Sequence, residues 1–94
     1  MQNFMEKYKE FLFRYDAFED GTHILYKFPN NYGASVIKTR YSRGGNRGLW
    51  EIAVIYFVDG DEWDIDYSTP ITGDTLGCLT DEKVCETLEK IKNL

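Results

Sequence analysis

The clearest pattern of hydrophobic and polar positions lies between residues 49 and 67. A nearly continuous apolar segment runs from Leu49 to Val58, an Asp-Gly pair follows at residues 59 and 60, and acidic side chains then alternate with bulky ones. An Asp-Gly pair tolerates the positive φ angles of a two-residue hairpin turn. The pattern therefore predicts an antiparallel β-hairpin.

A two-residue turn at residues 59 and 60 also sets the register of this hairpin. The pairs expected to face the core are Val58–Asp61, Tyr56–Trp63, Val54–Ile65 and Ile52–Tyr67. The opposite face then carries Glu62, Asp64 and Asp66 beside Phe57, Ile55 and Ala53. Because side chains alternate along a strand, this register predicts a face that mixes carboxylates with exposed apolar groups.

The N-terminal residues place aromatic and apolar side chains at the spacing of an amphipathic helix. These residues are Phe4, Tyr8, Phe11, Leu12 and Tyr15. Residues 11–18 are also rich enough in rings to form a strand. We expect a short helix here, followed by an edge strand.

The middle of the chain predicts further strands. Residues 22–28 alternate in the manner of a strand, turn formers follow at 29–33, and residues 34–41 fit the returning strand. Residues 42–48 contain three glycines and no apolar anchor, which predicts a mobile loop. Residues 68–79 lack periodicity and are expected to be a connecting loop that crosses one end of the sheet.

The C-terminal segment carries the strongest helix signals. Thr80 is a good N-cap, and Asp81 and Glu82 fall in the first turn, where the helix dipole favours anions. Apolar residues then repeat at helical spacing, namely Val84, Leu88 and Ile91. The predicted fold is α+β: an antiparallel meander of four to five strands, with a short N-terminal helix and a C-terminal helix.

Size and composition limit the class of protein. Ninety-four residues suit a single domain over 1–94, and the aromatic fraction of 16% supports an ordered core. No apolar run of 18 residues and no signal peptide is visible in the sequence, so we expect a cytoplasmic protein in a host cell.

Catalytic and metal-binding patterns are missing from the sequence. There is no P-loop, no GxSxG, no HExxH and no dinucleotide-binding motif, so we expect a protein that is not an enzyme and holds no cofactor. His23 is the only histidine, and a structural role for it outweighs that of a general base. Cys78 and Cys85 match no metal-ligand spacing and are expected to be free thiols.

Charge is distributed unevenly along the chain. The net charge is −5, yet residues 38–47 contain four basic residues and no acid, whereas residues 59–66 contain five acids and no base. Carboxylates at every second position of a strand recur about every 6.8 Å, and such a row can imitate a nucleic-acid backbone. The alternative is a solvated strand face without a partner. The candidate partner-binding residues are Asp59, Asp61, Glu62, Asp64, Asp66, Ile55, Phe57, Arg43 and Arg47.

The predicted loop at residues 42–48, here called the Arg-Gly loop, supports a different hypothesis. Arg40, Arg43 and Arg47 could contact phosphates, since glycine exposes backbone amides and arginine forks onto oxygens. The overall acidity argues against strong nucleic-acid binding.

Several segments resemble small uncharacterised proteins that bacteriophages and prophages encode. The similar segments are residues 26–37, 49–54, 66–72 and 77–82, and the likeness extends over about residues 15–94. Small acidic phage accessory proteins often bind and block a host protein, including restriction and CRISPR nucleases, so the resemblance implies an anti-CRISPR-like setting. A setting of this kind does not by itself establish a function.

The leading hypothesis is a phage accessory protein that evades host defence. It would bind a host nucleic-acid-handling protein, such as a CRISPR nuclease, and inhibit it sterically through the acidic hairpin face. The alternatives are a phage housekeeping or assembly module that self-associates, and a weak nucleic-acid binder that uses the Arg-Gly loop. A monomer and a homodimer are both compatible with the sequence.

Overall fold

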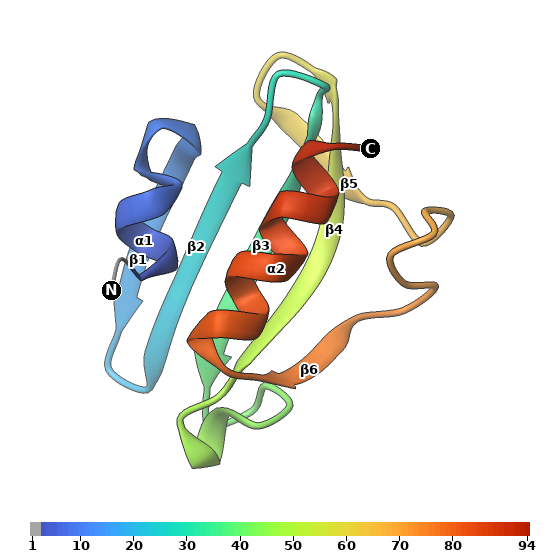
Figure 1. Cartoon of the computed structure of the whole chain (residues 1–94). Helices are drawn as coiled ribbons and strands as arrows, with labels where there is room; N and C mark the ends of the chain where they lie inside the picture. The colour runs from blue at the N-terminus through green and yellow to red at the C-terminus, as the bar shows by residue number, and fades with distance from the viewer. Residues whose placement is uncertain (1–2) are drawn as a thin grey trace.

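Six strands form one antiparallel sheet in the computed structural model, which describes residues 3–94 (Figure 1). The elements follow in the order α1 (Phe4–Lys7), the 3-10 turn η1 (Lys9–Phe11), β1 (Leu12–Phe18), β2 (Gly21–Lys27), β3 (Tyr32–Thr39), the 3-10 turn η2 (Gly45–Arg47), β4 (Trp50–Asp59), β5 (Glu62–Ile65), β6 (Leu76–Leu79) and α2 (Asp81–Lys92). The predicted α+β class and both terminal helices are confirmed.

Strands β1 to β5 are neighbours in sequence order, so the predicted meander is confirmed. Two strands pair with the outer edge of β4. β5 pairs with the second half of β4, and β6 pairs with Trp50 and Ile52 in the first half of β4. The prediction that residues 68–79 form only a loop is therefore wrong for the last four. Four residues that include Gly77 have little strand periodicity of their own, and pairing with a distant strand orders them.

Both helices lie on the same side of the sheet, here called the helical face (Figure 1). The buried side chains that meet there come from α1, three strands and α2: Phe4, Ile24, Tyr26, Val36, Trp50, Ile52, Val54, Val84, Leu88 and Ile91. The C-terminal helix starts as predicted, since the Thr80 hydroxyl accepts a hydrogen bond from the backbone N–H of Lys83. The apolar stripe of α2 thus supplies the cover of the central strands.

The N-terminal segment forms the predicted short helix and edge strand. Asn3 caps α1 by accepting from the backbone N–H of Glu6, and the chain then turns through η1 into β1. Tyr8 joins this segment to α2, because its hydroxyl donates to Glu89 at 2.7 Å. Burial, together with this hydrogen bond, raises the pKa of Tyr8 well above its usual value.

The face opposite the helices, here called the open face, has a second apolar cluster of Leu25, Ile55 and Phe57. Phe13 of β1 covers this cluster, with its ring centroid 5.0 Å from that of Phe57 in β4. In a flat sheet β1 and β4 would lie three strand spacings apart, about 14 Å. The contact therefore requires a sheet that curls toward the open face.

Gly33 of β3 makes this curl possible. A Cβ atom at this position would lie 3.0 Å from the Phe57 ring and 2.0 Å from the carbonyl oxygen of Tyr26. The absence of a side chain lets the Phe57 ring lie directly over β3.

The predicted register of the hairpin is wrong by one residue. The observed pairs are Ile55–Ile65, Tyr56–Asp64, Phe57–Trp63 and Asp59–Glu62, and a bulge at Val58 absorbs the extra residue. The turn residues are Gly60 and Asp61, with Gly60 at a φ of 57°. This register places Trp63 against the open-face cluster instead of the helical face. Burial of its indole therefore favours the observed register over the predicted one, which has its turn at residues 59 and 60.

Candidate partner-binding surface

Five acidic residues lie together at one end of the sheet, where β4 turns into β5, and we call them the acidic hairpin surface. They are Asp59, Asp61, Glu62, Asp64 and Asp66; four are exposed and Asp66 is half-buried. The structure thus brings all five predicted carboxylates into one region. Among the described residues, no three carboxylate, His or Cys side chains converge closely enough to hold a metal ion.

The face on which these carboxylates lie differs from the prediction. Asp64 stands opposite Tyr56, and Glu62 and Asp66 alternate with the residues that face the open-face cluster. The carboxylates of β5 therefore share the side of Tyr56 and Val54, and not that of Ile55 and Phe57. This correction follows directly from the bulge at Val58.

Ile55 and Phe57 do not form an exposed contact surface, contrary to the prediction. Ile55 is fully buried, and Phe57 keeps only 4% of its surface exposed. The Lys27 ammonium lies 4.8 Å from the centre of the Phe57 ring and donates to the carbonyl of Gly60. Phe57 is thus a core residue with a cation over its ring, and neither side chain leaves appreciable exposed surface for a dimer to bury.

Other apolar side chains lie exposed beside the acids. Val58 is 58% exposed and Tyr67 is 53% exposed, and Ile65 is also exposed. They line a shallow hollow of about 460 Å³ together with Tyr56, Asp64, Asp66 and Ser68. The sequence prediction missed these residues because their exposure depends on the bulge and on where β5 ends.

Asp66 is fixed at the rim of this hollow. The hydroxyl and the backbone N–H of Ser68 both donate to its carboxylate. These hydrogen bonds lower the pKa of Asp66 below its usual value. The hollow therefore keeps a negative charge at neutral pH.

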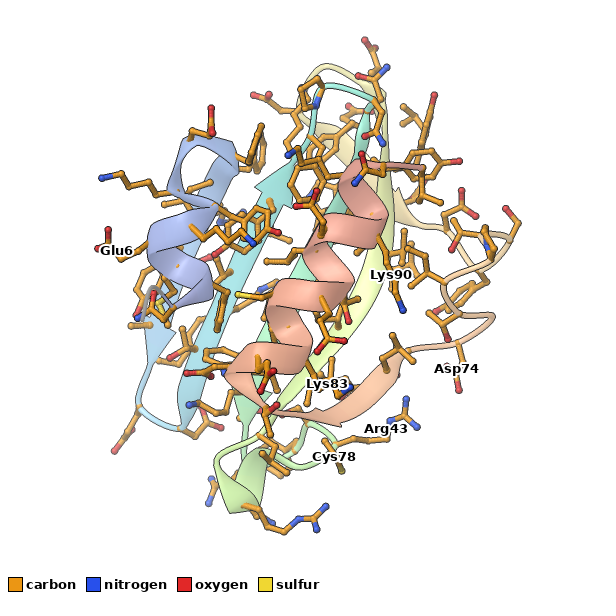
Figure 2. All side chains as sticks on the ribbon, in the orientation of Figure 1. Glu6, Arg43, Asp74, Cys78, Lys83 and Lys90 are labelled. Atoms are coloured by element: carbon orange, nitrogen blue, oxygen red, sulfur yellow. The ribbon has the colours of Figure 1, made fainter. Side chains whose placement is uncertain are left out.

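The predicted binding residues Arg43 and Arg47 lie at the other end of the sheet, in the loop between β3 and β4 (Figure 1). Arg43 holds Glu51 and Thr75: its backbone N–H donates to the Glu51 carboxylate at 2.9 Å, and its guanidinium donates to Thr75. The Arg47 guanidinium lies 2.9 Å from the Cys78 sulfur. Figure 2 shows Arg43 beside β6, the strand that contains Cys78.

These contacts give the 42–48 loop the anchors that its sequence lacks. Arg43 packs against Gly77, where an added Cβ would lie 2.6 Å from the Arg43 Cβ. Burial opposes ionisation of Glu51, but hydrogen bonds from Thr75 and Arg43 outweigh it and lower the Glu51 pKa. The structure therefore pairs the exposed Arg43 side chain with Glu51, at the end of the sheet away from the acidic hairpin surface.

His23 takes part in a polar chain across three strands of the open face. Its Nε2 lies 2.8 Å from the Ser35 hydroxyl, and Asp16 is its partner in the β1–β2 pairing. Burial lowers the His23 pKa, and the Asp16 carboxylate partly opposes this shift. Ser35 lies in a strand paired on both sides, so its neighbouring N–H groups serve the sheet and are not free to bind an oxyanion.

A groove of about 670 Å³ separates α2 from the 68–76 segment. Its apolar lining includes Pro70, Ile71, Leu76 and Leu94. Lys90 lies on the side of α2 that faces this segment (Figure 2). Sequence reasoning did not identify this groove, because its two walls come from segments that carry no shared motif.

Comparisons with known proteins identify no relative. No family model matches this chain, and no curated protein and no solved structure matches it either. Within residues 3–94, no helix is long and apolar enough to span a membrane.

Proposed function

We propose that this protein binds a basic partner protein through the acidic hairpin surface and inhibits it sterically. The observation that carries this proposal is the joint exposure of single-sign charge and apolar groups around one hollow, with Val58, Ile65 and Tyr67 beside Asp64 and Asp66. An interface of this kind needs charge for orientation and buried apolar groups for affinity.

The charge pattern suits a partner that normally binds nucleic acid. Glu62, Asp64 and Asp66 repeat along one face at a spacing of about 6.8 Å, close to that of successive phosphates. Mutual repulsion at this spacing costs only about 0.6 kcal/mol per pair in water. A basic groove would relieve the repulsion, and a net charge of −5 would speed the encounter.

For the class of partner we take up the phage-encoded setting that was expected from the sequence alone. In that setting we propose a host nucleic-acid-handling defence protein, such as a CRISPR nuclease, whose nucleic-acid groove the hairpin would occupy. The contacts that define its shape come from Val58, Ile65 and Tyr67, in place of Ile55 and Phe57.

A charge-reversal experiment tests the proposal. The Glu62→Lys/Asp64→Lys variant changes two exposed carboxylates and leaves the Asp66 turn intact. A matched control, Glu10→Lys/Glu19→Lys, makes the same change in net charge at exposed positions outside this surface.

Tagged wild type, variant and control are each used to capture partners from host lysate at moderate salt, and the nuclease activity of the captured complex is measured. We expect wild type and control to retain and inhibit a nucleic-acid-handling protein, and the variant to bind it about 100-fold more weakly. Equal capture and inhibition by the variant would disprove a role for the acidic hairpin surface.

A further inference from the structure

The first strand of the sheet has an unpaired edge. β1 is the terminal strand in the sheet order, and β2 is its only strand neighbour within residues 3–94. Backbone N–H and C=O groups along such an edge form a template for another strand.

Apolar side chains are concentrated on this edge. Tyr15 is 52% exposed and Phe18 is 53% exposed, and Leu12 is exposed at the other end of the strand. Three of seven strand residues are thus large, apolar and exposed. A partner strand would cover them and pair the backbone at the same time.

The charges of β1 are arranged symmetrically about Tyr15. Arg14 and Asp16 flank it, and their side chains already form an ion pair of 2.8 Å within the chain. In an antiparallel pair centred on Tyr15, Arg14 of each copy stands opposite Asp16 of the other. Phe18 lies near one end of the paired segment, and the bulge between Leu12 and Arg14 ends the regular pairing before Leu12.

We infer that β1 pairs with β1 of a second copy about a two-fold axis at Tyr15, which joins the two sheets into one. A two-fold axis demands a self-complementary surface, and the sequence of β1 has that property. This inference does not depend on the proposed inhibitory function, because it uses the opposite edge of the sheet.

Competing registers are unfavourable. A shift of one residue would set residues of opposite faces against each other. A shift of two residues would centre the pair on Arg14 or on Asp16 and place like charges opposite each other, which is destabilising. The bulge in β1 lies between Leu12 and Arg14, so it leaves the central pairs regular.

The other terminal strand does not offer the same solution. β5 presents Glu62 and Asp64 with no base between them, so two copies of β5 would repel each other. The second copy is therefore expected on β1 and not on β5.

Mass in solution gives the first test. Sedimentation equilibrium from about 10 µM to 1 mM should reveal a concentration-dependent species of twice the 11.0 kDa chain mass. Arg14→Asp and Asp16→Arg should each weaken this dimer at least tenfold, since each substitution creates two like-charge pairs. An equimolar mixture of the two variants should restore it as a heterodimer, because opposite charges then face each other.

Matched controls separate pairing from general charge effects. The exposed pair Arg40 and Asp20 lies 3.9 Å apart outside β1, and its reversal should leave the dimer unchanged. A chain that stays monomeric at 1 mM would overturn the inference. So would a dimer that both single variants retain, because its interface would then lie elsewhere.

A disulfide test measures the register directly. In a Cys78→Ser background, which removes the exposed native thiol, Tyr15→Cys should form an intermolecular disulfide under mild oxidation. Directly opposed residues have Cα atoms about 4.5–5.5 Å apart, within the range of a disulfide. Ala17→Cys should not cross-link, because its two copies would lie about 14 Å apart. Rapid cross-linking of Ala17→Cys with none at Tyr15→Cys would contradict the register.

Discussion

The two terminal strands of the meander, β1 and β5, differ in the charges that they present at their unpaired edges. β1 mixes one base and one acid with exposed apolar groups, so its surface is complementary to itself. β5 carries acids without a base, so we expect its surface to repel a second copy and to suit the basic partner proposed above. Backbone pairing is available at both edges, and the side-chain charges decide which strand can use it.

The two edges nevertheless share one apolar cluster on the open face. Phe13 of β1 and Trp63 of β5 both pack on it, and Phe57 lies between them. The edges can therefore be tested either through this common support or through their separate charges.

The largest expected effect comes from Phe57→Ala. Removing this ring leaves a cavity beneath both Phe13 and Trp63, so the free energy of unfolding should fall by about 3–5 kcal/mol. Urea denaturation followed by tryptophan fluorescence measures this change, with Val58→Ala as the exposed control. A loss below about 1 kcal/mol would mean that the edges do not depend on a shared cluster.

A smaller loss is expected for Gly33→Ala. The added methyl group would meet the carbonyl oxygen of Tyr26 and the Phe57 ring, so the strand or the ring must shift. We expect a destabilisation of about 1–3 kcal/mol. Combining Gly33→Ala with Phe57→Leu should recover part of this destabilisation, because the smaller side chain at position 57 leaves room for the methyl group. Strictly additive losses in the double variant would contradict the contact between position 33 and the Phe57 ring.

Acidification should loosen β6, which shares the outer edge of β4 with β5. Since the folded-state pKa of Glu51 is lowered, its contribution to stability is complete above the unfolded pKa near 4.3 and is lost as pH falls through the folded pKa. Glu51→Gln should remove this pH dependence and cost about 1 kcal/mol at pH 7. Hydrogen exchange of β6 amides between pH 3 and pH 6 measures this pH dependence. If Glu51→Gln shows the same pH profile as the wild type, Glu51 is not the group responsible.

The smallest expected effect is the one that each edge exerts on the other. Glu62→Lys/Asp64→Lys should change the dimer dissociation constant by no more than about twofold, and Arg14→Asp should change partner binding equally little. Sedimentation and partner binding, each measured on the wild type and on both variants, provide this comparison. Strong coupling would mean that one surface serves both contacts.

Local sequence features were sufficient for most of the fold. The N-cap at Thr80 and the helical spacing of Val84, Leu88 and Ile91 define α2, and the ring-rich residues 11–18 form the expected edge strand. The clustering of five carboxylates in the hairpin also follows from the sequence, because they are close along the chain. Propensity, capping and alternation act over a few residues and can be read without a fold.

Only the tertiary structure decided which side chains the hairpin exposes. The bulge at Val58 moves Trp63 to the open face, and the curl of the sheet brings Phe13 over Phe57, so two predicted contact residues became core. Likewise, the pairing of β6 with β4 brings Thr75 and Glu51 to Arg43, a contact that the sequence did not predict. Register and sheet curvature depend on contacts between strands far apart in the sequence, and a shift of a single residue reverses every face.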